Sequence, residues 1–326
     1  MFHSRHLNLQ GKTVFITGAG SGIGAACARL FHAQGAFVVL VDVSAGGINA
    51  LAGELGDART LARVASVTER DQLDQVVHET VARFGRIDVV FANAGIACDP
   101  PATVLHMKEV TFERIIEVNL LGVWRTVCAC LPFIIESKGH ILLTSSIYAY
   151  VNGMVNAPYA MSKAGVEMFG RALRAELAGT GATAGVLYPG WVSTPISRSA
   201  MGGHAVASAL VRLAYPGSLK TPIAPEAVAA ATLQGIQRRA ARIMVPRRWV
   251  PISMLRGIVN PISDWIIDLH RGIHALVREL EQQKKQQKNT NNIVIKSFLS
   301  LILFYRNFSL PSFQNELFFC TNDWDK

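Results

Sequence analysis

The first 190 residues alternate between short apolar runs and longer stretches in which apolar residues have helical spacing. The apolar runs predict buried strands at 12–17, 36–42, 61–66, 87–95, 139–146 and 183–190. The stretches between them predict helices at 22–35, 69–85, 111–136 and 158–178, the third of them bent near Pro132. Continuous apolar strands separated by helices are typical of a parallel sheet that is covered on both faces. We therefore expect an α/β fold with a single, doubly wound parallel sheet and right-handed connections.

The regular alternation weakens after residue 190. Residues 191–222 are rich in Gly, Ala, Ser and Pro, and this segment is too long for an ordinary loop, so we expect a lid with short helices. A helix near 225–239 and a strand near 241–245 would complete the sheet. These assignments predict one globular domain over residues 7–250, with the lid as part of it.

The C-terminal part has a different character. Residues 251–280 are expected to form an amphipathic segment, and 247–270 mixes arginines with Trp, Ile and Leu. That segment could contact a membrane surface peripherally, or it could pack over a pocket or against another subunit; the sequence leaves both open. Residues 281–292 read as a polar linker, and the apolar run at 293–308 is too short and interrupted for a membrane span. We expect 281–326 to be poorly ordered and assign it no function.

Composition and charge narrow the class of protein. Half of the residues are hydrophobic and 17% are charged, which suits a folded protein with a sizeable core. The five cysteines are scattered and show no CxxC pair, and the first residues lack an apolar signal segment, so we expect a cytoplasmic location. The net charge is +9, and six arginines lie close together in one part of the sequence: Arg238, Arg239, Arg242, Arg247, Arg248 and Arg256. This cluster is either a solvated basic edge or a site for an anionic partner, but no nucleic-acid-binding motif accompanies it, and we expect no nucleic acid partner.

The first predicted strand runs directly into the glycine-rich turn TGAGSGIG, Thr17–Gly24. A glycine permits the sharp turn and lets backbone N–H groups approach a pyrophosphate at the positive end of the following helix. Asp42 ends the second predicted strand, where a carboxylate can accept hydrogen bonds from an adenosine ribose and repel a 2′-phosphate. NAD is therefore favoured over NADP, although Asp42 could instead cap a helix that begins near residue 45.

Two further motifs follow in order: ANAG at 92–95, and Tyr159 four residues before Lys163. With the glycine-rich turn they make the chain resemble the short-chain dehydrogenase/reductase family over about residues 7–250, which implies an NAD(P)-binding Rossmann fold. The resemblance implies four catalytic residues: Asn119, Ser146 (with Ser145 as the adjacent alternative), Tyr159 and Lys163. The cofactor-binding residues it implies, together with those of the turn and Asp42, are Gly18, Ser21, Gly22, Ile23, Gly24, Asp42, Asn93, Ala94, Gly95, Tyr159, Lys163, Pro189, Gly190, Val192 and Thr194. Asn93 resembles the family's structural asparagine, which steadies the sheet near the cofactor.

The chain departs from the family pattern at two positions. Ser66-Val67 stands where many members have Asp-Val, and the Asp of that pair contacts adenine, so adenine contact is expected to be weaker or made by backbone. ANAG replaces the common NNAG, which leaves Asn93 in place. Neither departure touches the reacting groups.

The Tyr159–Lys163 pair fits the chemistry of alcohol oxidation, in which hydride leaves carbon while a proton leaves oxygen. A free phenol has a pKa of about 10, and a cation one helical turn away favours the phenolate. We expect Lys163, the helix N-terminus and the positive charge of bound NAD+ together to lower the pKa of Tyr159 by roughly three units, towards its working pH. Taken alone, the pair would be an ordinary i,i+4 contact, and the other motifs argue against that interpretation.

The resemblance and the chemistry together predict an NAD(H)-dependent oxidoreductase, an alcohol dehydrogenase or carbonyl reductase. The apolar lid favours a hydrophobic alcohol or ketone (steroid-, retinoid-, terpenoid- or lipid-like), with Tyr148, Tyr150 and Trp191 as pocket-lining or packing residues. The nine histidines show no metal-ligand spacing, and we expect no metal. By resemblance we expect a homodimer or homotetramer formed through 111–136 and 158–178. The alternative function is a catalytically silent dinucleotide-binding sensor or scaffold.

Overall fold

The structure is a computed structural model that describes residues 6–198, 203–215 and 217–286. The chain divides into two compact units, Met1–Val277 and Arg278–Lys326. Of the second unit, residues 278–286 are described and are helical, so the predicted linker begins as helix. The rest of the predicted linker and apolar tail, 287–326, lies outside the described residues.

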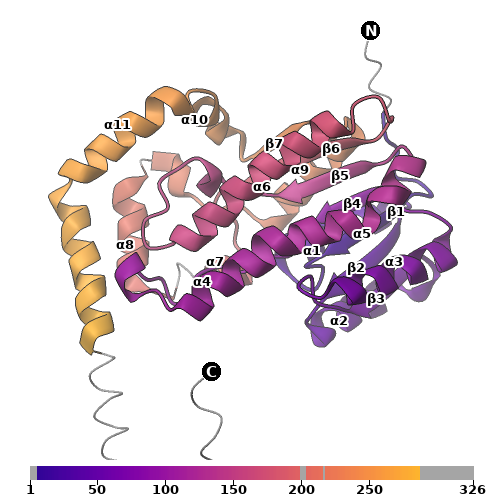
Figure 1. Cartoon of the computed structure of the whole chain (residues 1–326), viewed down its shortest axis with the longest axis horizontal. Coiled ribbons are helices and arrows are strands. Elements are labelled where there is room, and N and C mark those ends of the chain that lie inside the picture. Colours follow the sequence, from indigo (N-terminus) through magenta and orange to yellow (C-terminus); the bar gives the residue numbers. More distant parts are fainter. Residues whose placement is uncertain (1–5, 199–202, 216, 287–326) are drawn as a thin grey trace, which may run out of the picture. The chain divides into compact units, whose positions relative to one another are not determined.

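The described residues of the first unit form one sheet of seven parallel strands in the order β3-β2-β1-β4-β5-β6-β7 (Figure 1). The strands are β1 Thr13–Thr17, β2 Phe37–Asp42, β3 Thr60–Val64, β4 Val89–Ala92, β5 His140–Thr144, β6 Thr183–Pro189 and β7 Arg242–Val245. The order reverses between β1 and β4, which makes the carboxyl ends of these two strands the topological switch point, where such sheets bind ligands. The predicted doubly wound parallel sheet is confirmed.

Helices cover both faces of the sheet. They are α1 Gly22–Ala33, α2 Ala45–Leu55, α3 Arg70–Phe84, α4 Glu109–Ile116, α5 Gly122–Glu136, α6 Ala157–Glu176 and α9 Pro225–Gln237. Neighbouring strand residues point to opposite faces: Val14 and Ile16 pack in one core with α1, α2 and α9, and Phe15 packs in the other with α3, α5 and α6. Figure 1 shows α5 and α6 crossing in front of the strands. Short 3-10 turns lie at Asp57–Arg59, Val104–His106, Ile147–Ala149, Gly217–Lys220 and Arg247–Trp249.

The predicted helix 111–136 is two α-helices joined by a π-helical turn, Glu117–Leu121. Pro132 lies inside α5, so the irregularity comes at the π turn and not at the proline as predicted. A π turn holds one residue more than an α turn and is common at functional sites. Residues Glu109–Glu136 are long and apolar enough to span a membrane, but α5 contributes its apolar face to the core beneath the sheet, which accounts for its hydrophobicity.

The segment 191–222 contains the predicted short helices: α7 Pro195–Ser197 and α8 Ala205–Ala214. Val192 forms an isolated parallel bridge with Ile223, which ties the start of the segment to its end. Beyond β7 the chain continues into α10 Val250–Met254 and α11 Arg256–Leu269.

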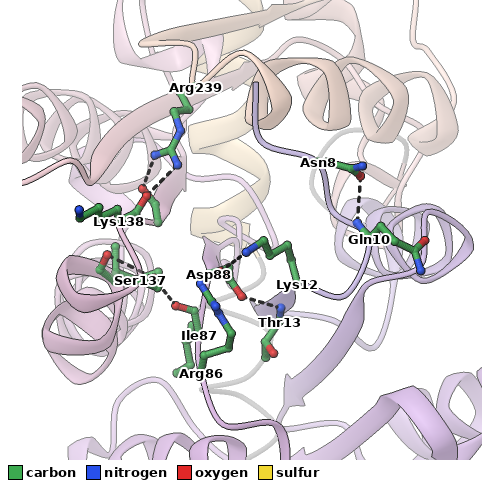
Figure 2. A network of polar contacts seen from close by, with 12 residues as sticks. Asn8, Gln10, Lys12, Thr13, Arg86, Ile87, Asp88, Ser137, Lys138 and Arg239 are labelled. Atoms are coloured by element: carbon green, nitrogen blue, oxygen red, sulfur yellow. Dashed lines mark hydrogen bonds and ion pairs between the residues drawn. The ribbon is translucent and has the colours of Figure 1, made fainter. Parts of the chain in front are cut away.

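A polar network lies at the amino ends of the strands (Figure 2). The buried carboxylate of Asp88 pairs with Lys12 at 3.2 Å and Arg86 at 2.6 Å, and accepts a hydrogen bond from the Thr13 N–H at 3.1 Å. Arg239 donates to the carbonyl oxygens of Lys138 and Gly139, both at 2.7 Å.

Intramolecular bonds engage much of the arginine cluster noted in the sequence. Besides Arg239, Arg242 bonds to the Ser253 hydroxyl, Arg248 bonds to the Thr221 carbonyl, and Arg256 pairs with Glu167 at 2.8 Å. A structural role therefore accounts for these members of the cluster without an anionic partner.

Candidate active site

A cavity of about 720 Å³ lies at the carboxyl ends of the strands, across the switch point between β1 and β4. Most of the residues predicted from the sequence line it: Gly18, Ser21, Gly22, Ile23, Asp42, Asn93, Ala94, Gly95, Ser146, Tyr148, Tyr159, Lys163, Pro189, Gly190, Trp191, Val192 and Thr194. Gly24, Asn119 and Tyr150 do not line it. A cavity of this size suits a dinucleotide together with a small substrate.

The glycine-rich turn leaves no room for side chains. Gly18 has a φ of +66°, and a Cβ there would lie 2.8 Å from the Ala94 Cα. A Cβ on Gly24 would lie 2.0 Å from the Gly18 carbonyl oxygen, so Gly24 allows α1 to pack on the turn. Gly24 was predicted to contact the cofactor, but it does not line the cavity. No side chain caps the N-terminus of α1, which leaves its first N–H groups free to bind a phosphate. These features fit the pyrophosphate of a dinucleotide.

Asp42 is fixed against this turn. One carboxylate oxygen accepts a hydrogen bond from Gly20 N–H and the other from Ser44 N–H, each at 2.9 Å. The N-cap of α2 is Ser44, whose hydroxyl accepts from Gly47 N–H, so the alternative in which Asp42 caps this helix is not what the structure has. The carboxylate is at the cavity wall, where a ribose hydroxyl could reach it.

Asn93 connects the ends of three strands. Its amide nitrogen donates to the carbonyl oxygens of Thr17 at 3.2 Å and Gly18 at 3.3 Å, and its amide oxygen accepts from the Thr144 hydroxyl at 3.2 Å. These contacts fix β1, β4 and β5 relative to one another beneath the cavity. They fit the structural role that the resemblance implied.

The two adjacent serines have different surroundings. The Ser145 hydroxyl is buried and donates to the Lys163 carbonyl oxygen at 2.7 Å, which holds α6 on the end of β5. The Ser146 hydroxyl accepts from Tyr148 N–H at 3.2 Å and interacts with the Tyr159 hydroxyl. Ser146 is therefore the serine that lies beside the phenol.

Lys163 is buried and lines the cavity. Its ammonium donates to the Thr144 carbonyl oxygen at 3.1 Å and lies 5.4 Å from the centroid of the Tyr159 ring. Among the described residues no carboxylate pairs with it, and burial lowers its pKa to about 8.

The pKa of Tyr159 differs from the sequence-based expectation. Burial raises it above its ordinary value, and the interaction with Ser146 lowers it by less. The expected drop, which included the charge of bound NAD+, is not present in the ligand-free protein, because desolvation of the phenolate outweighs the favourable interaction with Ser146. The phenol is protonated in this state.

Asn119 lies in the π turn and is fully buried. Its side chain accepts from Ile96 N–H at 2.8 Å and donates to the Ile96 carbonyl oxygen at 2.9 Å and the Ser162 hydroxyl at 3.2 Å. Through these bonds it fixes the loop after β4 against α6, one residue away from Lys163.

Aromatic rings form one wall of the cavity. Tyr148 meets Tyr159 and Trp191 edge to face, with centroid distances of 5.7 and 5.8 Å. Tyr150 packs on Tyr188, away from the cavity, so the suggestion that it lines the pocket is wrong. Its ring is needed to fill the core cluster beside β6.

The sequence did not single out several other residues that line the cavity. These are mainly neighbours of the recognised motifs: Val43, Ile96, Ala97, Ile147, Asn156 and Ile196, with Arg114 and Glu117 at one side. For Val43, Ile96, Ala97 and Ile147 the available signal was their position shortly after a strand end. Ser66, the departure from the family pattern, lines the cavity and shares a hydrogen bond with the Thr68 hydroxyl at 2.7 Å. Within the described residues no cluster of His, Cys, Asp or Glu could hold a metal ion.

Known proteins share both the sequence pattern and the fold. A family model described as short chain dehydrogenase matches residues 12–203. The chain is 37% identical over 194 residues to 3-oxoacyl-[acyl-carrier-protein] reductase FabG of Thermotoga maritima, covering 59% of this chain and 78% of that protein. A crystal structure of 3-ketoacyl-(acyl-carrier-protein) reductase from Brucella melitensis complexed with NADH is similar with a TM-score of 0.65 and 28% identity, over 73% of this chain and 97% of that one. An alcohol dehydrogenase from the archaeon Thermococcus sibiricus complexed with 5-hydroxy-NADP has a TM-score of 0.62 and 26% identity, over 72% and 95%.

Proposed function

The chain belongs to the short-chain dehydrogenase family of oxidoreductases, and from that premise we propose that it transfers a hydride between NAD(H) and the carbinol or carbonyl carbon of a hydrophobic alcohol or ketone. The observation that carries the proposal is the grouping of Ser146, Tyr159 and Lys163 on one wall of a cavity whose other end is a glycine-rich turn. A silent sensor would need the turn alone.

The proposed roles follow from the geometry. The nicotinamide, when bound, accepts or supplies the hydride. Tyr159 exchanges a proton with the substrate oxygen, and Ser146 holds that oxygen beside the phenol. Because burial keeps the pKa of Tyr159 raised, the ligand-free protein presents a protonated phenol, which is the form that donates a proton to a ketone during reduction.

Lys163 is proposed to stabilise the phenolate form of Tyr159. A buried ammonium stabilises a phenolate formed nearby, since little water screens the two charges. Its lowered pKa, about 8, means that it also loses a proton readily near neutral pH and can pass that proton on.

The choice of NAD(H) rests on Asp42. Its carboxylate is held at the cavity wall by two backbone N–H groups, where it would bond a ribose hydroxyl and repel a 2′-phosphate. Structurally similar proteins include complexes with NADH and with an NADP analogue, so the preference of this chain is part of the proposal.

The substrate class rests on the walls beside Tyr159. Ile147, Tyr148, Trp191 and Ile196 present apolar surface there, which favours a hydrophobic substrate. The relative from Thermotoga maritima is a 3-oxoacyl-[acyl-carrier-protein] reductase, which makes a 3-oxoacyl thioester the second candidate.

A steady-state assay tests the proposal. NADH consumption is measured with a panel of cyclic and long-chain ketones and with 3-oxoacyl thioesters, for the wild type, Tyr159→Phe and Tyr150→Phe. Tyr159→Phe is expected to lower kcat by about 10²–10⁴-fold while it retains NADH binding, because only the proton donor is removed. Tyr150→Phe removes a hydroxyl outside the cavity and should keep near-normal turnover.

Three outcomes discriminate between the candidates. Turnover of ketones alone supports the hydrophobic alcohol–ketone pair, and a strong preference for the thioesters replaces it with the acyl substrate. NADH binding without turnover of either class would favour the sensor or scaffold.

We also propose that the protein is a cytoplasmic homodimer or homotetramer. Leu121 of the π turn and Trp124 and Ile135 of α5 are exposed, and so are Met161 and Met168 of α6. Exposed apolar side chains at helical spacing on two neighbouring elements support an interface between copies of the chain. Light scattering on the purified protein measures the mass directly.

A further inference from the structure

Helix α11 carries an exposed apolar stripe, which we define as Leu255, Ile258, Ile262, Trp265, Ile266 and Leu269. These side chains are between 48% and 64% exposed. Their spacing of three and four residues places them on one side of the helix. Residues at such spacing normally face a core, and these face outwards.

The rest of the protein lies on another side of α11. Arg256 pairs with the buried Glu167 of α6 at 2.8 Å, and Asp264 accepts a hydrogen bond from the Asn152 side chain at 3.1 Å. No residue of α11 is buried, and the helix lies at the periphery, away from the sheet (Figure 1). A helix of 14 residues is marginal in water without packing, so the stripe is expected to have a binding partner.

The charges around the stripe indicate the partner. Arg247 precedes α10 and Arg271 follows α11, both are exposed, and neither forms an ion pair within the described part of the chain. Of the acids of the helix, Asp264 contacts Asn152, and Asp268, four residues after it and three after Trp265, lies between that contact and the stripe. The stripe itself thus contains no acid, and the exposed cations nearest to it in the chain are Arg271, after α11, and Arg247, before α10.

We propose that this surface docks α11 on an anionic lipid membrane, with the stripe lying in the interfacial region and Arg247 and Arg271 against the headgroups. Amphipathic helices bind in this way by burying an apolar face and attracting acidic lipids, and a tryptophan such as Trp265 suits the interfacial depth. A second protein chain fits less well, because a stripe about 20 Å long and one helix wide offers roughly 250 Å², against about 800 Å² per partner in a stable interface. This inference does not depend on the proposed reaction.

Vesicle flotation of the full-length chain tests the docking. The vesicles are phosphatidylcholine alone and a mixture of phosphatidylcholine with phosphatidylserine. The stripe variants are Ile262→Glu and Trp265→Glu, and the matched control is Gly257→Glu, which adds the same charge to the same helix at an exposed position outside the stripe, where a Cβ meets no atom within 4 Å. Residues 287–326 are the same in every protein compared.

The wild type and Gly257→Glu are expected to float with the mixed vesicles, and each stripe variant to bind at least tenfold more weakly. Arg247→Gln and Arg271→Gln should each weaken binding about fivefold on mixed vesicles and little on neutral ones. Unchanged flotation of the stripe variants would overturn the proposal. So would a wild type that does not float but loses a subunit in light scattering when Ile262→Glu is introduced, since the stripe would then bind a second copy.

Discussion

Lys163 is 2% exposed and lacks a carboxylate partner among the described residues, which is an unusual environment for an ammonium group. Its pKa falls from 10.5 to about 8 because burial penalises the charged form. Between these two values the unfolded chain binds more protons at this site than the folded protein does, so stability rises with pH there. Below pH 8 both states are protonated, and the full cost of the buried charge is present.

This linkage can be measured by comparison with Lys163→Met. We expect the free energy of unfolding of the wild type, relative to the variant, to increase by about 2 kcal/mol between pH 7.5 and pH 10. Urea denaturation of both proteins at several pH values gives the difference. A difference that stays flat across this range would mean that Lys163 keeps its ordinary pKa.

Asp42 is the residue at which cofactor choice is expected to be decided. Asp42→Asn removes the charge but retains an acceptor for Gly20 or Ser44 N–H. The ratio of kcat/KM for NADH over NADPH should fall about 5–30-fold, because removal of like-charge repulsion is worth roughly 1–2 kcal/mol at a partly exposed site. Steady-state kinetics with both cofactors measures the ratio, and equal ratios in variant and wild type would dismiss the role of the carboxylate.

At the scale of elements, Gly24 at the start of α1 and Gly53 in α2 differ in the space around them. Gly24→Ala would place a Cβ 2.0 Å from the Gly18 carbonyl oxygen, so α1 must move away from the turn. Gly53 lies within α2, and a Cβ there meets no atom within 4 Å. The two identical substitutions therefore separate steric requirement from helix propensity.

We expect Gly24→Ala to lower the free energy of unfolding by about 1–3 kcal/mol and to weaken NADH binding, since overpacking displaces the phosphate-facing turn. Gly53→Ala should raise the free energy of unfolding by about 0.5–1 kcal/mol and leave NADH binding unchanged. Denaturation curves and NADH fluorescence titrations measure both. Equal effects of the two substitutions would show that the close approach at Gly24 is not a constraint.

The element that sequence reasoning missed is the π turn. The apolar spacing through 111–136 predicted one helix, and the proline drew attention to position 132. The actual irregularity surrounds Asn119. Its side-chain amide bonds to Ile96, in the loop after β4, and to Ser162, in α6. Side-chain bonds between distant segments leave no mark in local periodicity.

At the scale of the whole molecule, the strand order, the two covered faces and most of the cavity could be predicted. Strand and helix periods are local properties, and the motifs follow strand ends, which parallel topology gathers at one edge. The raised pKa of Tyr159 could not be predicted, because it depends on competition between burial and charge. The choice between a pocket-lining and a packing role for Tyr150 stayed open, because it depends on which rings surround it in three dimensions.

The amino ends of the strands offer a test of stability alone. Asp88 bonds there to Lys12, Arg86 and the Thr13 N–H (Figure 2). The cavity lies at the carboxyl ends of the same strands. Asp88→Ala should lower the free energy of unfolding by about 2–4 kcal/mol, because a backbone N–H loses its acceptor and two cations lose their partner. The variant's kcat and KM should match those of the wild type. A large change in either would reveal coupling between the amino and carboxyl ends of the strands.

The bridge between Val192 and Ile223 closes the segment 191–222 into a loop whose two ends lie side by side. Such a loop can be exchanged as a unit, because its first and last residues are neighbours and β6 and α9, on either side of it, do not have to move. Trp191 and Ile196 of this stretch line the cavity, and so do Val192 and Thr194. We therefore expect a chimaera carrying this stretch from a relative to change the side chains around the proposed substrate and nicotinamide, while Ser146, Tyr159 and Lys163 stay in place.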